Sequence, residues 1–220
     1  MFDIPGPEEF AIKAAVIAVM LLVAFPIHEF AHALAAFRLG DGTARLMGRL
    51  TLNPMAHFDQ TGGLLLAITV LFTSFGFGWA KPTPYNPMNL RGGQWGEAIV
   101  AVAGPISNFV LAVAAAIPLR YMDAVGMNVP LLELFLGFFV TINLVLMVFN
   151  LIPIPPLDGS KLLFAFMDQR TAWRVRPVLE QYGFIILLGA LLLPIFGGAT
   201  LIDIVFSELL RPLQHLLTGR

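Results

Sequence analysis

Residues 15–37 read AVIAVMLLVAFPIHEFAHALAAF, and this stretch decides the fold class of the chain. It is an apolar run close to the length of about 20 residues with which a helix crosses the hydrocarbon core of a membrane. It nevertheless holds three ionisable side chains, His28, Glu29 and His32. Unpartnered ionisable groups in such a run are costly and usually mark a functional site. The stretch therefore predicts a membrane-spanning helix that contains part of a functional site.

The composition of the whole chain also favours a membrane protein. Of its 220 residues 58% are hydrophobic and 12% are charged, about half the charged fraction of a soluble domain, and the mean hydropathy is +0.82. The net charge of -1 argues against a nucleic-acid partner. Because the chain has no cysteine, it has no disulfide framework and no thiol nucleophile, and any metal must be bound by nitrogen and oxygen ligands.

Further apolar runs predict a polytopic helical bundle. After a first run at about residues 11–38, others cover about 62–78, 97–119, 131–152 and 178–196. A last run at about 199–217 holds Asp203, Glu208 and Arg211, so it either spans the membrane or lies along its surface. The acidic start MFDIPGPEEF and the lack of a small-residue cleavage site predict that the first run is retained rather than removed as a signal peptide.

Two connecting segments predict extended structure. Apolar residues fall mainly on alternate positions at 44–52, which is typical of a strand or hairpin, and prolines forbid a continuous helix at 77–87. We therefore expect a membrane all-α fold with a small membrane-associated β hairpin or sheet and one re-entrant or interfacial segment. We expect a single domain over residues 1–220, with a catalytic core at about 11–165 and C-terminal helices at about 178–217.

The spacing of the ionisable residues in HEFAH is that of a zinc site. His28 and His32 are four residues apart, so on a helix they stand one turn apart on the same face and can supply two zinc–nitrogen bonds. Glu29 projects near the open position of such a metal, where it can take a proton from water. Chance occurrence is the competing explanation, and the apolar surroundings of the motif argue against it.

A catalytic zinc needs a third protein ligand, which without cysteine must be His, Asp or Glu. The best candidate is Asp158 in NLIPIPPLDGSK (150–161), where prolines end a helix and Gly159 allows a sharp turn. Broken helices at membrane depth are tolerated where protein or a water-filled cavity surrounds them. The alternative is that PPLDG forms an ordinary loop turn.

HEFAH in the first run, AGPISN (103–108) in a middle run and NLIPIPPLDG (150–159) after a later one resemble the site-2 protease family of intramembrane zinc metalloproteases. The resemblance covers residues from about 20 to 165 and is that of a minimal-core member without PDZ or CBS domains. It implies one zinc ion per chain with His28, His32 and Asp158 as ligands. It also implies Glu29 as the catalytic base.

In the same resemblance Asn150 matches an asparagine near the substrate, and Asn108 matches the polar position of the middle helix. Either amide is a candidate for binding the substrate backbone or the oxyanion. The implied substrate is a single-span membrane protein, cut in or near its transmembrane segment in regulated intramembrane proteolysis. Two alternatives are a zinc transporter or other metal-binding membrane protein, and an inactive relative that binds transmembrane helices.

Shared zinc ligation constrains the topology. The histidines lie toward the end of the first run and Asp158 lies just after the run at 131–152, so these two runs must be parallel and the run at 62–78 must not cross. Basic residues then gather on one side of the membrane: Arg38, Arg45, Arg49, Lys81, Arg91, Lys161, Arg170, Arg174 and Arg176, against Lys13 and Arg120 on the other. The positive-inside rule makes the rich side cytoplasmic. We therefore expect a multi-pass protein of a prokaryotic inner membrane with its active site nearer the cytoplasmic face.

Overall fold

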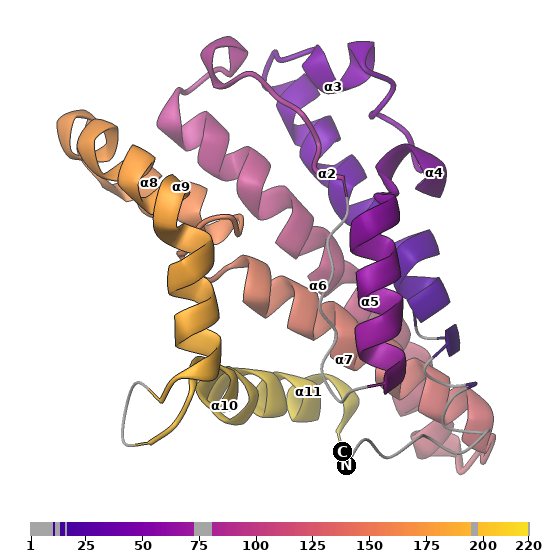
Figure 1. The fold of residues 1–220 in the computed structure, drawn as a ribbon. Coiled ribbons are helices and arrows are strands. Elements are labelled where there is room, and N and C mark those ends of the chain that lie inside the picture. Colours follow the sequence, from indigo (N-terminus) through magenta and orange to yellow (C-terminus); the bar gives the residue numbers. More distant parts are fainter. Residues whose placement is uncertain (1–10, 12–13, 16, 73–80, 195–197, 220) are drawn as a thin grey trace.

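The fold is a bundle of helices (Figure 1), and the computed structural model describes residues 11, 14–15, 17–72, 81–194 and 198–219. The elements are η1 (Met20–Ala24), α2 (Phe25–Arg38), α3 (Thr43–Leu46), α4 (Pro54–His57), α5 (Gln60–Phe72), η2 (Pro87–Asn89), α6 (Gln94–Val125), α7 (Pro130–Asn150), α8 (Gly159–Phe166), α9 (Gln169–Leu192), α10 (Leu201–Ile204), η3 (Val205–Leu210) and α11 (Arg211–Thr218).

Within the described part of the chain, four helical stretches are long and apolar enough to cross a membrane: Ile17–Arg38, Gln94–Val125, Pro130–Asn150 and Gln169–Leu192. The described part of the run at 62–78 is α5, whose 13 residues reach about 20 Å, less than the roughly 30 Å of the hydrocarbon core. That the whole run does not cross stays a prediction. The residues after Phe72 in that run lie outside the described part of the chain.

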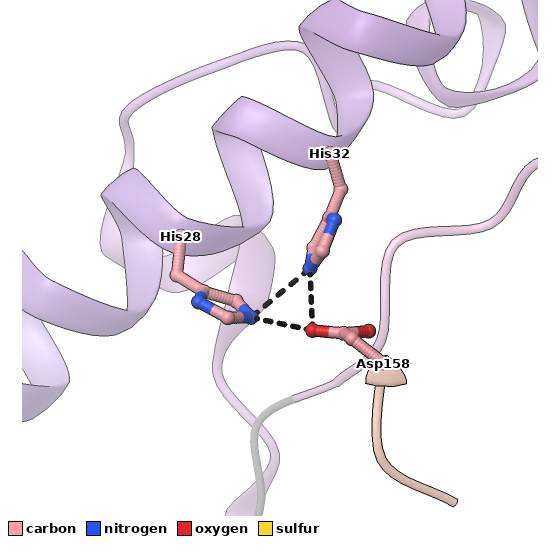
Figure 2. Close-up of side chains that lie close together, drawn as sticks. All are labelled: His28, His32 and Asp158. Carbon is pink, nitrogen blue, oxygen red and sulfur yellow. Dashed lines mark hydrogen bonds and ion pairs between the residues drawn. The ribbon is translucent and has the colours of Figure 1, made fainter. Parts of the chain in front are cut away.

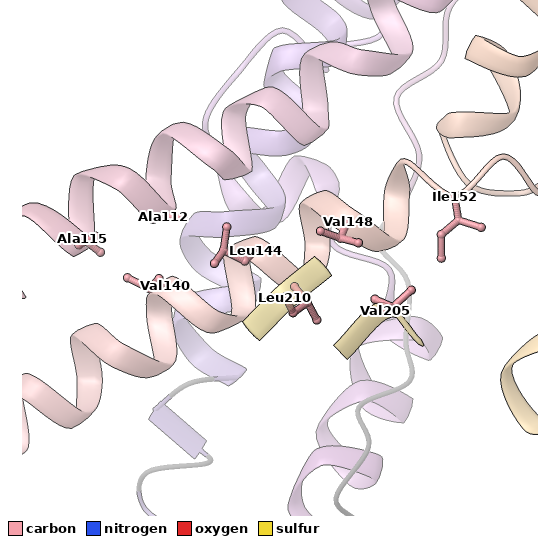
Figure 3. Packing of buried hydrophobic residues seen from close by; sticks show 9 residues of the cluster. Ala112, Ala115, Val140, Leu144, Val148, Ile152, Val205 and Leu210 are labelled. Carbon is pink, nitrogen blue, oxygen red and sulfur yellow. The ribbon is translucent and has the colours of Figure 1, made fainter. Parts of the chain in front are cut away.

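The central core lies where α6, α7 and the C-terminal helices meet (Figure 3). Ala112 and Ala115 of α6 face Val140 and Leu144 of α7, and the small alanines let the two helices approach closely. Val205 and Leu210 of η3 cover the other side of this layer. The continuous stretch α10–η3–α11 is not among the four candidate spans, and in Figure 1 it runs across the end of α9 instead of continuing it.

The predicted β hairpin is wrong. No β-strand occurs among the described residues, and segment 44–52 contains the last three residues of α3 followed by turns. Thr43 begins the helical turn, Gly48 takes φ +69°, and the Arg49 amide returns to the Ala44 carbonyl at 2.7 Å. The alternating pattern was misread because a compact loop that buries Ala44 and Arg49 also places apolar and polar residues close together. Of the second predicted extended piece, residues 81–86 have no regular structure and 77–80 lie outside the described residues.

Candidate metal centre

Three potential ligand atoms from two distant parts of the chain meet at one point (Figure 2). Nε2 of His28 lies 3.0 Å from Nε2 of His32, and Oδ2 of Asp158 lies 3.3 Å and 3.2 Å from these two nitrogens. Both histidines are buried, with 7% of each residue exposed. The structure therefore brings together the three side chains that the sequence predicted as ligands.

The distances and the chemistry of this group fit zinc. With zinc bonds of about 2.0–2.1 Å, the ligand atoms of a tetrahedral site lie about 3.3 Å apart. Nδ1 of His32 lies 2.7 Å from the carbonyl oxygen of Val100, which can only accept, so Nδ1 carries the proton and Nε2 presents a lone pair. A lone pair facing a second imidazole and a carboxylate is repulsive unless a proton or a cation lies among them.

Asp158 faces the histidines because it does not cap its own helix. It occupies the N-cap position of α8, yet its backbone is helical and its side chain makes no capping hydrogen bond. Asp168, at the N-cap of α9, shows the usual behaviour and accepts from the amides of Arg170 and Thr171. Oδ2 of Asp158 accepts no hydrogen bond from the described residues, which leaves it available to a cation.

Two glycines hold the segment that carries Asp158. A side chain at Gly159 would collide with the carbonyl of Leu151, and one at Gly183 of α9 would collide with Pro155. The backbone of the segment is thus folded back on itself and packed against α9 without intervening side chains. Both contacts restrict the position of the carboxylate.

Helix α6 closes one side of the metal centre through Gly104. A Cβ atom at this position would lie 2.6 Å from Nε2 of His28 and closer still to Nε2 of His32. Atoms in ordinary contact are about 3.5–4.0 Å apart, so only glycine leaves room for the two rings. The sequence showed AGPISN as part of a motif but gave no sign of this contact.

Glu29 has a partner that sequence reasoning missed. The backbone amide of Thr83 donates to Oε2 of Glu29 at 2.7 Å, and the Thr83 hydroxyl donates to the Glu29 carbonyl at 2.9 Å. Thr83 stands between Pro82 and Pro84, which have no N–H, so its amide is the single backbone donor of this tripeptide. That pattern was the available signal. Among the described residues Oε1 of Glu29 accepts no hydrogen bond.

Hydrogen bonds to other parts of the chain hold the segment that contains Thr83 in place. The Lys81 amide donates to the His57 carbonyl at 2.9 Å, and the fully buried Asp41 accepts from the Asn86 amide at 2.9 Å and from Nδ2 of Asn89 at 3.0 Å. Burial raises the pKa of Asp41, but hydrogen bonds from Thr43, Asn89 and Asn86 outweigh it and hold the pKa of this carboxyl below its ordinary value. Thr83 is thus placed beside Glu29 by an anchored loop.

The two predicted asparagines occupy different surroundings. Asn108 of α6 is fully buried, and its Nδ2 lies 3.1 Å from Nδ1 of His28. Asn150, the last residue of α7, is half-buried and donates Nδ2 to the Leu146 carbonyl at 2.9 Å. The structure therefore brings Asn108 to the metal centre, whereas no hydrogen bond among the described residues joins Asn150 to the three ligand side chains.

A buried ion pair joins α6 to α9 beside this region. Glu97 is 4% exposed and accepts from Nη1 and Nη2 of Arg176 at 2.8 Å and 2.7 Å, while the Tyr85 hydroxyl donates to it at 3.1 Å. Arg176 also bonds Glu180 at 2.8 Å and stacks over the Phe164 ring. This bidentate pair fixes the start of α9, the helix that packs on the Asp158 segment.

The amino-acid sequence is similar to those of known proteins. The sequence model of Peptidase family M50 matches residues 125–192, a range that includes Asn150 and Asp158. YwhC of Bacillus subtilis is 36% identical over 184 residues, covering 81% of each chain. Rip2 of Mycolicibacterium smegmatis is 32% identical over 174 residues, covering 79% of this chain and 65% of Rip2. Both relatives carry the name "Putative zinc metalloprotease". No solved structure gives a significant match.

Proposed function

Because the chain belongs to peptidase family M50, the site-2 proteases, we propose that His28, His32 and Asp158 bind one zinc ion and that Glu29 is the catalytic base. The chain is an integral, multi-pass membrane metalloprotease that uses zinc to hydrolyse peptide bonds of membrane proteins. The observation that carries the assignment of residues is the convergence of Nε2 of both histidines and Oδ2 of Asp158.

The chain's own groups perform the proton transfers. When bound, zinc polarises the scissile carbonyl and acidifies a water molecule. Oε1 of Glu29 takes a proton as the water oxygen bonds to the carbonyl carbon, and it returns this proton to the departing amide nitrogen as the C–N bond breaks. Thr83 holds Oε2 throughout, so the carboxylate keeps one orientation.

The substrate must present an extended backbone. A helical substrate hides its carbonyls in hydrogen bonds to amides four residues on, so the segment to be cut must unwind. The amide of Asn150, the last residue of α7, is our candidate for binding the unwound backbone or the oxyanion. A single-span protein is the simplest substrate, because one helix can enter from the lipid without dismantling a bundle. The same role for Asn108 stays a prediction.

Cleavage of a model transmembrane substrate by detergent-purified protein tests the assignment. Glu29→Gln should keep one zinc per chain and lose about 10³-fold in kcat, as expected for a general base. His32→Ala should lose zinc and activity together. Full cleavage by a zinc-loaded Glu29→Gln would refute the assigned roles, and zinc flux into vesicles without cleavage by the wild type would favour a transporter.

We also propose that the protein lies in a prokaryotic inner membrane with the active site nearer the cytoplasm. Support comes from the basic residues of 38–91 and 161–176 and from the bacterial sources of the relatives. Since the chain has no cysteine, single cysteines can report each side of α6. In intact cells a membrane-impermeant maleimide should label Met127→Cys but not Met88→Cys, both at exposed positions. The reverse pattern would invert the topology.

A further inference from the structure

In the described part of the chain, the buried side-chain amide of Asn108 has a hydrogen-bond partner at its nitrogen but none at its oxygen. Nδ2 lies 3.1 Å from Nδ1 of His28, whereas Oδ1 is buried and has no hydrogen-bond partner among the described residues. The side chain is fully buried on α6. A buried amide oxygen without a donor has lost its hydrogen bond to water without a replacement, so the arrangement requires a reason.

Metal binding by His28 decides which end of the amide faces its ring. Nε2 of His28 points at His32 and Asp158, and as a ligand it gives up its lone pair. The neutral ring then carries its proton on Nδ1 and needs an acceptor there. Nδ2 of an amide cannot accept. Oδ1 can, and a half-turn of the amide exchanges the two atoms at almost no change in shape.

The exchanged orientation also removes the unsatisfied oxygen. Oδ1 then receives the Nδ1–H of His28, and Nδ2 becomes the free end. Asn143 and Asn150 each donate Nδ2 to the carbonyl one turn earlier in their helices, at 2.9 Å. The corresponding carbonyl for Asn108 is that of Gly104, which already accepts from the Ser107 hydroxyl at 2.7 Å, so Nδ2 of Asn108 would share this acceptor.

His32 provides an independent parallel. Its Nδ1 is 2.7 Å from the Val100 carbonyl, an obligate acceptor, so its Nε2 is already directed at the metal position. Val100, Gly104 and Asn108 are spaced four residues apart and form one stripe on α6. The outer two supply acceptors for the two rings, and Gly104 between them supplies the space.

We propose that Asn108 is a positioning residue for the metal centre, whose Oδ1 accepts the hydrogen bond from Nδ1 of His28 and thereby fixes Nε2 toward the zinc. The inference rests on the proposed function and deepens it. It assigns Asn108 to the ligand instead of to the substrate.

Zinc affinity, measured without substrate, separates these roles. Metal-stripped protein in detergent is titrated with zinc against a chromophoric chelator. Asn108→Leu, with Asn108→Ala as a second variant that cannot overpack, should bind zinc about 10–100-fold more weakly, the usual effect of losing such a partner. Asn108→Asp keeps an acceptor oxygen, so its zinc affinity should lie within about threefold of that of the wild type. It should also cleave the substrate, unlike the leucine and alanine variants at the same zinc concentration.

Asn143 of α7 is the matched control, since it is equally buried and its Oδ1 is also unpartnered. Asn143→Leu should leave zinc affinity unchanged. Wild-type affinity in both Asn108→Leu and Asn108→Ala, or an equal loss in Asn143→Leu, would overturn the inference. If the Asn108 variants bound zinc with unchanged affinity but had a reduced kcat at saturating zinc, the inference would be wrong and Asn108 would act on the oxyanion. Failure of the wild type itself to bind one zinc would overturn the proposed function, and this inference with it.

Discussion

Replacing Gly104 by alanine should strongly weaken zinc binding while leaving the helical bundle assembled. The added Cβ would lie 2.6 Å from Nε2 and Cε1 of His28 and closer still to Nε2 of His32. To restore ordinary contact the ring of His28 must retreat by about 0.9 Å. Zinc–ligand distances tolerate deviations of about 0.2 Å, so the retreat breaks the coordination geometry.

The cost to the fold is smaller than the cost to the site. Alanine is favoured over glycine in a helix by about 1 kcal/mol, and overpacking costs about 1–3 kcal/mol, so the metal-free protein should lose at most about 2 kcal/mol. Zinc affinity should fall by more than about 100-fold, or about 2.8 kcal/mol.

Chelator competition and substrate cleavage measure the effect, and thermal unfolding of the metal-free protein monitors the fold. Gly137→Ala in α7 is the matched control, because a Cβ there meets nothing within 4 Å. It should leave zinc affinity and cleavage unchanged and the melting temperature equal or higher. If Gly104→Ala bound zinc like the wild type, α6 would not pack against the ligand rings as described.

Three further predictions follow from contacts around the site. Thr83→Val removes the hydroxyl donor to the Glu29 carbonyl but keeps the amide donor, so kcat should fall about fivefold at unchanged zinc content. Thr83→Ser keeps a hydroxyl and should have the wild-type kcat. An unchanged kcat in Thr83→Val would show that the hydroxyl is dispensable. Arg176→Met leaves Glu97 buried without its cation and should lower the free energy of unfolding by about 3 kcal/mol. Arg174→Met, at an exposed position, should leave it unchanged, and thermal unfolding of both variants measures the difference. Asp41→Asn should lower the melting temperature at pH 7, and this difference should shrink as the pH falls below about 4. Because folding lowers the pKa of Asp41, its contribution is present above the ordinary carboxyl pKa and is lost as the pH falls through the folded value. A melting-temperature difference that stayed constant with pH would contradict that origin.

The motifs made most of the site predictable, and the reasons are local. His28 and His32 share a helical face by spacing alone, and prolines with Gly159 mark the break at which Asp158 turns inward. The resemblance to the site-2 proteases is confirmed by the comparisons. Four of the predicted apolar runs correspond to candidate spans.

The remaining features depend on contacts between distant parts of the chain. Thr83 meets Glu29 across 54 positions and Asn108 meets His28 across 80, and no local pattern reports either pairing. The strand predicted at 44–52 failed for a related reason: the backbone there is held by Arg49, whose guanidinium donates to the Ala56 carbonyl. The periodicity of a sequence shows how apolar and polar side chains alternate, but it does not show which acceptor a buried arginine such as Arg49 will bind.

The separation of the ligands in the chain also sets the order in which the enzyme becomes active during synthesis. The helix with both histidines leaves the ribosome well before Asp158, and α6 and α7 must insert between them. Until then the histidines have neither the carboxylate nor the acceptors of α6. We therefore expect the nascent chain to be proteolytically inert, so that a bilayer crowded with newly inserted helices is not exposed to an unfinished protease.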